Sequence, residues 1–466
     1  MPKITFMGAG STVFAKSILG DSLVTPALQE SHIALYDIDA VRLKESKKML
    51  DVLNRNINGN RALITTHLGT ANRREALKGA KYLVNAIQVG GYAPATIIDF
   101  EIPKKYGLRQ TIGDTLGIGG IFRALRTIPV VIDFAKQMEQ VCPDAWFLNY
   151  VNPMAMITGA LLEGSGIRSV GLCHSVQVCA THLLRELGIP FSDKLNWSIA
   201  GINHQAWLLQ ISDDGRDLYP QIKARATKLV ADALKKGAGK YFERESRKAG
   251  ENWWQTRPDL IVFTDLVRLE MMRHFGHYLT ESSEHSAEYV PYWIKRTHPK
   301  LIDQYNIPLD EYPRRCKAHI ERWKKQSAGL MSNPDLTHTR SHEYGSNIME
   351  AIETDRPARI HGNILNHGFI PNLPSRACVE VPCLVDRNGV HGCYTGDLPE
   401  QCAALNRTNI NVQLLTIDAA LKRKKDLIYQ AAMMDPHTAA ELSLDEIRSM
   451  CDDLIAAHGK YLPAYK

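Results

Sequence analysis

The chain has 466 residues, of which 44% are hydrophobic and 23% are charged, and its formal net charge is +6. This composition is typical of a folded protein with two or three domains, and it excludes an intrinsically disordered chain. The basic residues are spread along the sequence, and clusters such as residues 422–425 are short. A solvent-exposed helix face explains such clusters better than a nucleic-acid-binding surface, so no nucleic acid partner is predicted.

The sequence contains neither an export-signal pattern nor an apolar run long enough to cross a membrane. Its nine cysteines have no regular spacing, and no two of them form a Cys-x-x-Cys pair. These features predict a cytoplasmic protein with reduced thiols, without membrane attachment and without a structural zinc cluster.

The first half of the chain alternates apolar, strand-like runs with helix-like segments. Strands are expected at 4–7, 33–36, 82–87, 146–148 and 170–172, and helices at 11–23 and 42–54. The strands lack a clean alternation of polar and apolar residues, which is typical of a parallel sheet buried on both faces. Residues 1–195 are therefore predicted to form an α/β domain with a Rossmann-like, doubly wound parallel sheet.

The pattern changes near residue 195. Strands are expected at 196–202 and 207–212, followed by a hairpin turn at Asp213-Asp214-Gly215. Long helical stretches are expected at 219–247, 260–275 and 405–434. Residues 196–466 are therefore predicted to form a second, α+β domain.

A glycine turn joins the first expected strand to the first expected helix in the sequence MGAGS, residues 7–11. Gly8 permits a tight turn, and Gly10 lets the backbone approach a pyrophosphate at the helix N-terminus, where Ser11 lies. Val13 occupies the place of the third glycine in the usual GxGxxG pattern. A strand-to-helix turn without a ligand is therefore the alternative.

Asp37 ends the second expected strand, 27 residues after Gly10. A carboxylate at this place can accept hydrogen bonds from both hydroxyls of a ribose, and it would repel the 2′-phosphate of NADP. The alternative role for Asp37 is the N-cap of the helix that follows. The glycine turn and Asp37 together predict a site for NAD.

Three short motifs each lie at the end of an expected strand. They are NYVNP at 149–153, GLCHS at 171–175 and GINHQ at 201–205. Because the carboxyl ends of parallel strands meet at one edge of a sheet, Cys173 and His204 are expected to be neighbours. A thiolate and an imidazole can hold a divalent metal ion, although a buried core cysteine and a hydrogen-bonded histidine are the alternatives.

In this order and spacing, the GAGS turn, NYVNP, GLCHS and GINHQAW resemble glycoside hydrolase family 4, whose members depend on NAD and manganese. The likeness extends over essentially the whole chain and includes VEVP at 379–382. Within the family the sequence is most similar to the enterobacterial α-galactosidases (melibiases). The resemblance thus implies hydrolysis of melibiose-like α-galactosides, and an α-galacturonidase or α-glucosidase of the same family is the nearest alternative.

The resemblance also implies a role for the second domain. It would resemble the C-terminal domain of lactate and malate dehydrogenases, contribute to the substrate and metal site, and join subunits into a homodimer or homotetramer. The implied reaction oxidises C3 of the sugar with NAD, removes the C2 proton, eliminates the leaving group and adds water.

Roles for individual residues follow from the same resemblance. Cys173 and His204 match the metal ligands, and Asn152 matches the substrate-binding asparagine. Asn149 precedes it in the same loop, near the cofactor or the sugar. His174 follows the metal-binding cysteine, where phosphoglycosidase relatives carry a general acid, and histidine can fill that role near neutral pH. A hydrogen-bonding contact to the substrate is the alternative role for His174.

The general base is not fixed by the resemblance. Several relatives carry Tyr or Asp six residues after a Phe/Tyr-Gly pair, and counting from Phe275-Gly276 leads to Ser282, which is a poor base. The stretch 278–285 offers Tyr278, Glu281 and Glu284 instead, of which Tyr278 and Glu281 are favoured as the base and Glu284 is expected to contact the substrate. Substrate positioning or a loop salt bridge is the alternative for each of them.

Two other classes of protein stay open. A 2-hydroxy-acid dehydrogenase shares the predicted fold but does not need the Cys173 and His204 pair. A nucleotide-binding regulator would keep the NAD site and lack catalysis.

Overall fold

The computed structural model describes residues 1–250 and 252–466. Six strands of the first half run parallel to one another. They are β1 (Lys3–Met7), β2 (His32–Asp37), β3 (Leu63–Leu68), β4 (Tyr82–Asn85), β5 (Trp146–Asn149) and β6 (Arg168–Gly171). Their spatial order, β3-β2-β1-β4-β5-β6, is that of a Rossmann fold. The predicted Rossmann-like parallel sheet is confirmed.

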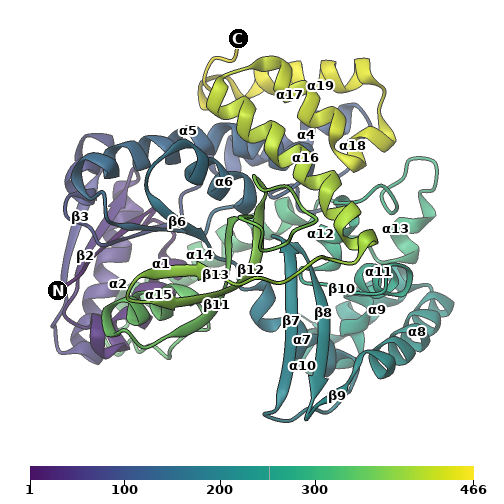
Figure 1. Cartoon of the computed structure of the whole chain (residues 1–466), viewed down its shortest axis with the longest axis horizontal. Coiled ribbons are helices and arrows are strands. Elements are labelled where there is room, and N and C mark those ends of the chain that lie inside the picture. The colour runs from purple at the N-terminus through teal and green to yellow at the C-terminus, as the bar shows by residue number, and fades with distance from the viewer. Residues whose placement is uncertain (251) are drawn as a thin grey trace.

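Helices cover both faces of these strands. The helices of the first half are α1 (Thr12–Val24), α2 (Ala40–Asn58), α3 (Arg73–Leu77), α4 (Ile97–Lys105), α5 (Gly117–Val141), α6 (Met154–Gly164) and α7 (Ser175–Glu186). Helix α1 packs against α2 on one side of the strands, and α5 packs against α6 on the other (Figure 1). Every residue of β4 and β5 is buried in consequence, which explains why these strands lack a polar face.

The strands of the second half extend the same sheet with antiparallel pairs. They are β7 (Leu195–Ile202), β8 (Gln205–Asp213), β9 (Arg216–Asp217), β10 (Tyr278–Leu279), β11 (Ala358–Leu365), β12 (Cys378–Asp386) and β13 (Gly389–Gly392). The sheet continues from β6 through β11, β12, β7 and β8 to β10. Two pairings make this join: Asn363 of β11 lies opposite Gly171 of β6, and Glu380 of β12 lies opposite Gly201 of β7.

The second half of the chain also forms helices. They are α8 (Tyr219–Lys236), α9 (Ala238–Ala249), α10 (Trp253–Thr256), α11 (Leu266–Phe275), α12 (Ser283–Glu288), α13 (Lys300–Gln304), α14 (Glu311–Ser332), α15 (Tyr344–Thr354), α16 (Glu400–Lys422), α17 (Lys425–Met434), α18 (Pro436–Glu441) and α19 (Leu444–His458). Two helices predicted as continuous are each divided. Gly237, with φ +71°, separates α8 from α9, and Arg423, with φ +57°, ends α16 before α17. A left-handed residue cannot continue a right-handed helix.

Other boundaries also differ from the sequence prediction. The strand expected at 82–87 ends at Asn85, and the helix expected at 260–275 begins as a 3₁₀ turn, Pro258–Thr264, before α11. The predicted hairpin turn at residues 213–215 does connect β8 to β9. Strand β3 was not predicted because it is an edge strand whose residues are mostly exposed or half-buried, so its hydrophobic signal is weak.

The C-terminal helices return to the first half of the chain. Helix α16 packs against α5 and α6 (Figure 1). At the end of α19, His458 Nε2 lies 3.0 Å from Asp99 Oδ1, and Arg126 of α5 donates to the other oxygen of Asp99 at 2.6 Å. All three side chains are almost fully buried, so this network anchors the last helix against the Rossmann layer. The division of the chain near residue 195 stays a prediction.

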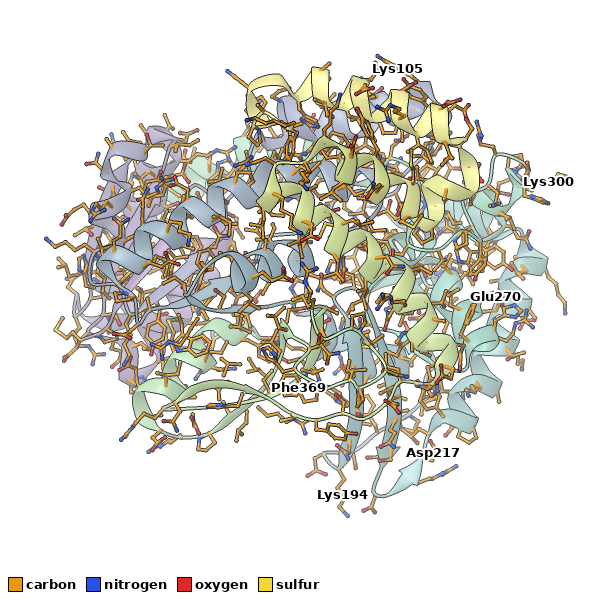
Figure 2. The ribbon with its side chains drawn as sticks, turned by 45° about the horizontal axis from the view of Figure 1, so that its top comes forward. Lys105, Lys194, Asp217, Glu270, Lys300 and Phe369 are labelled. Carbon is orange, nitrogen blue, oxygen red and sulfur yellow. The ribbon has the colours of Figure 1, made fainter. Side chains whose placement is uncertain are left out.

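The surface carries its positive charge in separate places. Lys105, Lys194 and Lys300 are exposed and project from distant parts of the molecule (Figure 2). Among the described helices, none combines the length and the apolar character that crossing a membrane would require.

Candidate active site and cofactor cradle

The glycine turn after β1 has a geometry that other residues would disturb. Gly8 has φ +87°, and the N–H groups of Gly8 and Ala9 both donate to the Tyr36 carbonyl at 3.0 Å. A Cβ atom on Gly8 would lie 2.7 Å from the carbonyl group of Ala86. The turn therefore brings the ends of β1, β2 and β4 together, and it needs glycine both for its backbone conformation and for space.

Asp37 is held against the glycine turn. Its Oδ2 accepts a hydrogen bond from the Gly10 N–H at 2.6 Å, and its Oδ1 accepts one from the Asp39 N–H at 2.8 Å. Helix α2 is capped by Asp39, whose side chain accepts from the N–H groups of Val41 and Arg42, so the alternative role of Asp37 as an N-cap is wrong. The carboxylate is instead half-buried at the rim, where a ribose bound beside the turn would meet it.

Ser11 and Val13 complete the start of α1. Ser11 occupies the N-cap position, is exposed and makes no side-chain capping bond. Val13, in the place of the third glycine, is 50% exposed and so does not disturb the packing of α1 on the sheet. The turn retains the features that a pyrophosphate needs, namely a helix N-terminus and a close backbone approach.

The expected proximity of Cys173 and His204 is confirmed, and Glu281 joins them. Cys173 Sγ lies 3.4 Å from His204 Nε2, and His204 Nε2 lies 3.5 Å from Glu281 Oε2. One ligand atom from each of the three residues lies within 4.8 Å of those of the other two. Because these three residues could together hold a metal ion, we call them the metal-ligand cluster.

Three separate segments form the metal-ligand cluster. Cys173 lies between β6 and α7, and Glu281 lies between β10 and α12. His204 lies in the two-residue turn between β7 and β8 and adopts φ +63°, the left-handed conformation that such tight hairpin turns use. Because β6, β7 and β10 are not consecutive in the sheet, only its folding brings these residues together.

Each member of the cluster is oriented by a neighbour. His204 Nδ1 lies 3.3 Å from the hydroxyl of Tyr289, so its Nε2 faces Cys173 and Glu281. Cys173 Sγ lies 3.3 Å from the Ser175 hydroxyl, and the Glu281 Oε1 accepts from the Ser282 N–H at 2.9 Å. Such outer contacts are typical of metal ligands, whose orientation they fix.

The electrostatics of the cluster suit a divalent cation. Burial raises the pKa of the Cys173 thiol, and the carboxylates of Glu380 and Glu281 raise it further. Burial also acts to raise the pKa of Glu281, but the imidazoles of His204 and His285 hold it at about 2. A thiol surrounded by carboxylates gains most from a cation, which would favour its thiolate form.

A second carboxylate lies beneath the cluster. Glu380 of β12 is fully buried, its Oε1 accepts from Asn363 at 3.2 Å, and its Oε2 has no hydrogen-bond partner. Both polar side-chain atoms of Asn203, which precedes His204, are also buried without a partner. Thiolate, imidazole and carboxylate donors beside such unsatisfied groups fit a first-row divalent metal ion.

His285 and Asp114 were missed as site residues. The rings of His285 and His204 lie 4.7 Å apart, and His285 Nε2 lies 3.8 Å from Asp114 Oδ1. Its Nδ1 lies 2.8 Å from the Ser282 hydroxyl and 3.8 Å from the Glu281 Oε1. The sequence signal for Asp114 was available, because it is the second residue of the glycine-rich segment GDTLGIGG, residues 113–120, which leads into α5.

Asp114 connects this region to Asn152. The side-chain amide of Asn152 donates to Asp114 Oδ2 at 3.4 Å, and the backbone carbonyl of Asn152 accepts from Arg123 Nε at 3.1 Å. Burial acts to raise the pKa of Asp114, but its hydrogen bond with His285 and the nearby Arg123 guanidinium keep that pKa well below its usual range. Asn152 is half-buried, so the predicted substrate residue lies at the edge of a charged, ordered network.

Two other predicted residues have partners outside the metal-ligand cluster. The hydroxyl of Tyr278 donates to Asp265, and the Arg268 guanidinium lies 4.6 Å from the centre of its ring. Burial raises the pKa of Tyr278 well above its usual value, which disfavours the phenolate that a base would need. Glu284 pairs with Arg315 of α14 at 2.6 Å.

Asn149 and His174 lie near the rim in different settings. Asn149 is fully buried, and its amide donates to the Val151 carbonyl at 3.2 Å and to the Thr158 hydroxyl at 3.1 Å. These bonds occupy its side chain inside the fold, where it holds the loop in place. His174 is exposed at the start of α7, next to Cys173, and its ring opposes the rise in pKa that burial causes at Glu343.

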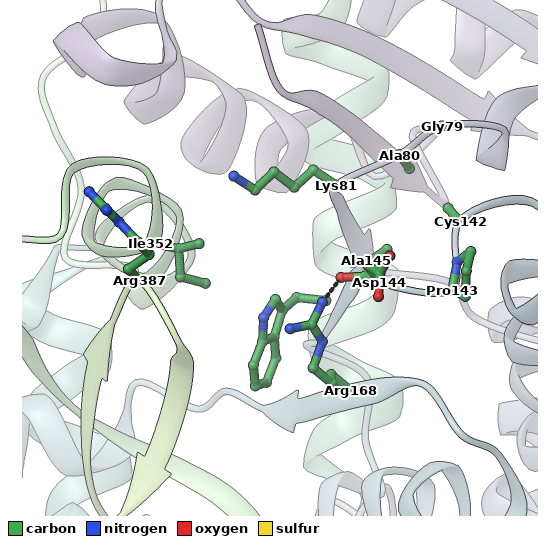
Figure 3. A pocket seen from close by; sticks show the side chains of 11 residues that line it. Gly79, Ala80, Lys81, Cys142, Pro143, Asp144, Ala145, Arg168, Ile352 and Arg387 are labelled. Carbon is green, nitrogen blue, oxygen red and sulfur yellow. Dashed lines mark hydrogen bonds between the residues drawn. The ribbon is translucent and has the colours of Figure 1, made fainter.

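A separate cavity of about 430 Å³ lies at the amino ends of β4, β5 and β6, opposite the rim that holds the site. Lys81 and Arg168 extend toward it, and Arg387 also lines it (Figure 3). Lys81 is paired with Glu353 at 2.8 Å, and Arg168 stacks on Trp146. These contacts stabilise the sheet edge and lie away from the candidate site.

Comparison with known proteins shows the family to which the chain belongs. Residues 3–189 match the family described as family 4 glycosyl hydrolase, and residues 199–438 match the family 4 glycosyl hydrolase C-terminal domain. The chain therefore belongs to the family 4 glycosyl hydrolases.

Similar proteins of known name extend over the full length. An α-galactosidase of Bacillus subtilis (strain 168) is 56% identical over 466 residues, covering 100% of both chains. An α-galactosidase of Rhizobium meliloti (strain 1021) is 35% identical, covering 99% of this chain and 89% of the relative. Among solved structures, a putative glucosidase from Bacillus subtilis has 25% identity and a TM-score of 0.81, covering 97% and 99% of the two chains.

A further solved structure supports the fold alone. It is a 6-phospho-α-glucosidase from gut microorganisms in complex with NAD and Mn²⁺, with 20% identity and a TM-score of 0.76 over 100% of both chains.

Proposed function

We propose that this protein is an α-galactosidase that hydrolyses melibiose-like α-galactosides and uses NAD and Mn²⁺. The observation that carries the proposal is the metal-ligand cluster at the same edge of the sheet as the glycine turn. A 2-hydroxy-acid dehydrogenase has no need of such a cluster, and a glycosidase that works with two carboxylates has no need of a dinucleotide site. The choice of galactoside is supported by the identity to the two relatives named α-galactosidase.

The cofactor half of the proposed site consists of Gly8, Gly10, Ser11 and Asp37. The glycine turn would receive the pyrophosphate, and Asp37 would accept hydrogen bonds from the adenosine ribose. Its position against the Gly10 N–H supports this role, since it places a carboxylate beside the turn. NAD, and not NADP, is expected because a 2′-phosphate would face the Asp37 carboxylate.

The catalytic half would act on the sugar ring. When bound, NAD supplies a reversible hydride acceptor at C3, and Mn²⁺ supplies a Lewis acid for the sugar hydroxyl oxygens. Cys173 and His204 hold the ion, and Asn152 orients the sugar. Asn149 supports the Asn152 loop from within the fold.

Proton transfers fall to groups around the cluster. His174 is the proposed general acid, which gives its proton to the glycosidic oxygen as that bond breaks. For the removal of the C2 proton, His285 is better positioned than Tyr278, because its ring lies between Asp114 and Glu281 and next to His204. Replacing His285 with Gln should lower kcat by about 100-fold or more and abolish deuterium exchange at C2, with Mn²⁺ affinity little changed. Unchanged exchange would reject His285 as the base.

We also propose the setting in which the enzyme works. A reduced Cys173 and a nicotinamide cofactor are consistent with a cytoplasmic enzyme. The resemblance to family 4 favours a homodimer or homotetramer in which residues 196–466 join the subunits, with no nucleic acid partner. Light scattering on the purified protein measures the subunit number directly, and a monomer at working concentration would contradict this assembly.

One experiment tests the activity itself. The purified protein is stripped of nucleotide and metal and assayed with 4-nitrophenyl α-galactoside, with and without NAD, Mn²⁺ and a thiol reductant. Activity only when all three are present is the expected result. Full activity of the stripped protein would overturn the proposal, and net accumulation of NADH with a hydroxy acid would favour a dehydrogenase. Parallel assays with α-glucosides and α-galacturonides test the substrate preference.

A further inference from the structure

We propose that Glu281 is a third protein ligand of the divalent ion, together with Cys173 and His204. This inference rests on the proposed metal-dependent function and deepens it, because it assigns to the ion a residue that the sequence had suggested only as a base. The inference comes from the geometry of the metal-ligand cluster and not from any motif, since Glu281 lies in none of the three motifs that follow strands.

The distances between the three residues suit ligands of one ion. His204 Nε2 lies 3.4 Å from Cys173 Sγ and 3.5 Å from Glu281 Oε2. Bonds of about 2.0–2.3 Å from one metal ion to nitrogen, oxygen and sulfur, at angles near 100°, separate the ligand atoms by roughly 3–3.6 Å. A direct N–H···O hydrogen bond would instead bring His204 and Glu281 to about 2.7–3.2 Å. The two distances from His204 therefore fit ligands of one ion, and the ligand atoms of Cys173 and Glu281 lie within 4.8 Å of each other.

The carboxylate of Glu281 is oriented for this role. Its Oε1 is occupied by the Ser282 N–H at 2.9 Å, and its Oε2 is the oxygen nearest His204. The Glu281 side chain is 20% exposed, whereas that of His204 is 6% exposed, so the carboxylate closes the cluster on its more open side. An outer hydrogen bond to one oxygen, with the other oxygen free, is the arrangement expected of a monodentate carboxylate ligand.

Glu380 is the other carboxylate near the cluster, and it is less suited to bind the ion. It is fully buried on β12, and its Oε1 accepts from Asn363. No oxygen of Glu380 belongs to the group of close ligand atoms found in the described residues. Glu281 is therefore the carboxylate that supplies an oxygen donor at the cluster.

A third ligand would change the chemistry of the site. A thiolate and an imidazole alone form a soft donor set, which favours zinc and copper over manganese. A carboxylate oxygen makes the set harder and more negative, which favours Mn²⁺. With three protein ligands, an octahedral ion retains open positions for two hydroxyl oxygens of a sugar.

Metal binding by variants of the purified protein tests the inference. The variants are Glu281→Gln, which keeps the shape of the side chain, Glu281→Asp, which keeps the charge, and Cys173→Ser. The matched control is Glu270→Gln, since Glu270 is also well buried but pairs with Arg273 on α11 at 2.6 Å. Mn²⁺ affinity is measured by the electron paramagnetic resonance signal of free Mn²⁺, and circular dichroism checks the fold.

The expected result is a Mn²⁺ affinity weakened by about 30-fold or more in Glu281→Gln, with a smaller loss in Glu281→Asp and none in the control. In protein loaded with Co²⁺, the thiolate charge-transfer band should persist in Glu281→Gln while the d–d bands shift. Affinity within threefold of the wild type in both Glu281 variants, with a large loss in Cys173→Ser, would overturn this inference alone. Unchanged affinity in Cys173→Ser as well would overturn the proposed metal-dependent function.

Discussion

The two halves of the candidate site are built in different ways. The cofactor half uses backbone N–H groups, a glycine conformation and one carboxylate, all within residues 8–37. The metal half uses side chains from three distant segments, and Cys173 and Glu281 are more than 100 residues apart in the chain. Changes in the first half are therefore expected to act through backbone geometry, and changes in the second half through the chemistry of single atoms.

The halves also differ in electrostatic cost. Gly8 and Ala9 satisfy their N–H groups on Tyr36, and Asp37 accepts two backbone hydrogen bonds. The metal half instead buries Cys173 and Glu380 beside Glu281, and Glu380 retains an unsatisfied oxygen. Without a cation this half opposes folding, whereas the cofactor half is already satisfied by the protein.

The largest effect is expected from removing the sulfur. Cys173→Ser should lower kcat/KM for an α-galactoside by on the order of 1,000-fold, because a serine hydroxyl does not replace a thiolate as metal ligand. NAD affinity, measured by fluorescence titration, should stay within about threefold of the wild type. A parallel loss of NAD affinity would show that the two halves are not independent.

The next effect concerns stability and pH. Burial raises the pKa of Glu380 from 4.5 to about 7, so the folded protein holds a proton that the unfolded chain releases. Metal-free protein should therefore lose stability as pH rises from about 4.5 to about 7, by on the order of 3 kcal/mol from this group, and no further above that. Urea unfolding in EDTA at pH 5 and pH 8 measures the difference.

The variant Glu380→Gln separates this contribution from others. It should reduce the pH dependence without abolishing it, because burial also raises the pKa of Glu288 to about 7. At pH 8 the metal-free variant should be more stable than the wild type, whereas at pH 5 the two should be similar. If the free energy of unfolding changed equally with pH in the wild type and in the variant, Glu380 would not hold the proton.

A smaller effect is expected in the cofactor half. In Gly10→Ala, the new Cβ would lie 2.8 Å from Asp37 Oδ2 and 3.0 Å from Arg42 Cβ, so the carboxylate must move. NAD affinity should fall by roughly 10- to 100-fold, while Mn²⁺ affinity stays unchanged. Isothermal titration calorimetry with NAD and with Mn²⁺ measures the two affinities. Unaltered NAD binding would exclude the turn as the pyrophosphate site.

The smallest effect is expected from Asp37 itself. Asp37→Ala should weaken NAD binding by about tenfold and reduce the discrimination against NADP, because both the ribose acceptor and the repulsive charge are removed. The ratio of the dissociation constants for NAD and NADP is the measurement. A ratio equal to that of the wild type would leave Asp37 without a role in cofactor choice.

Sequence reasoning succeeded where the signal is local. Strand β1, the glycine turn and Asp37 lie within one continuous stretch. Unbroken apolar runs predict the buried strands β4 and β5. It failed for β3 because an edge strand has a weak pattern, and for the break at Arg423 because no glycine or proline marks it. Tyr278 is a candidate base only because it lies in the stretch 278–285, and a position in the sequence cannot show that its hydroxyl is bound to Asp265.

The sequence by itself predicted the family from its motifs, the parallel sheet from its apolar runs and the glycine turn from a local pattern. It predicted Cys173 and His204 as neighbours from their places at strand ends, and the structure confirms this at 3.4 Å. Only the tertiary structure decided that Glu281 joins this pair, that His285 and Asp114 line the same place, and that Glu284 is bound to Arg315. The reason is physical. Backbone conformation depends on neighbouring residues, whereas contacts between side chains that follow β6, β7 and β10 depend on how the whole sheet is assembled.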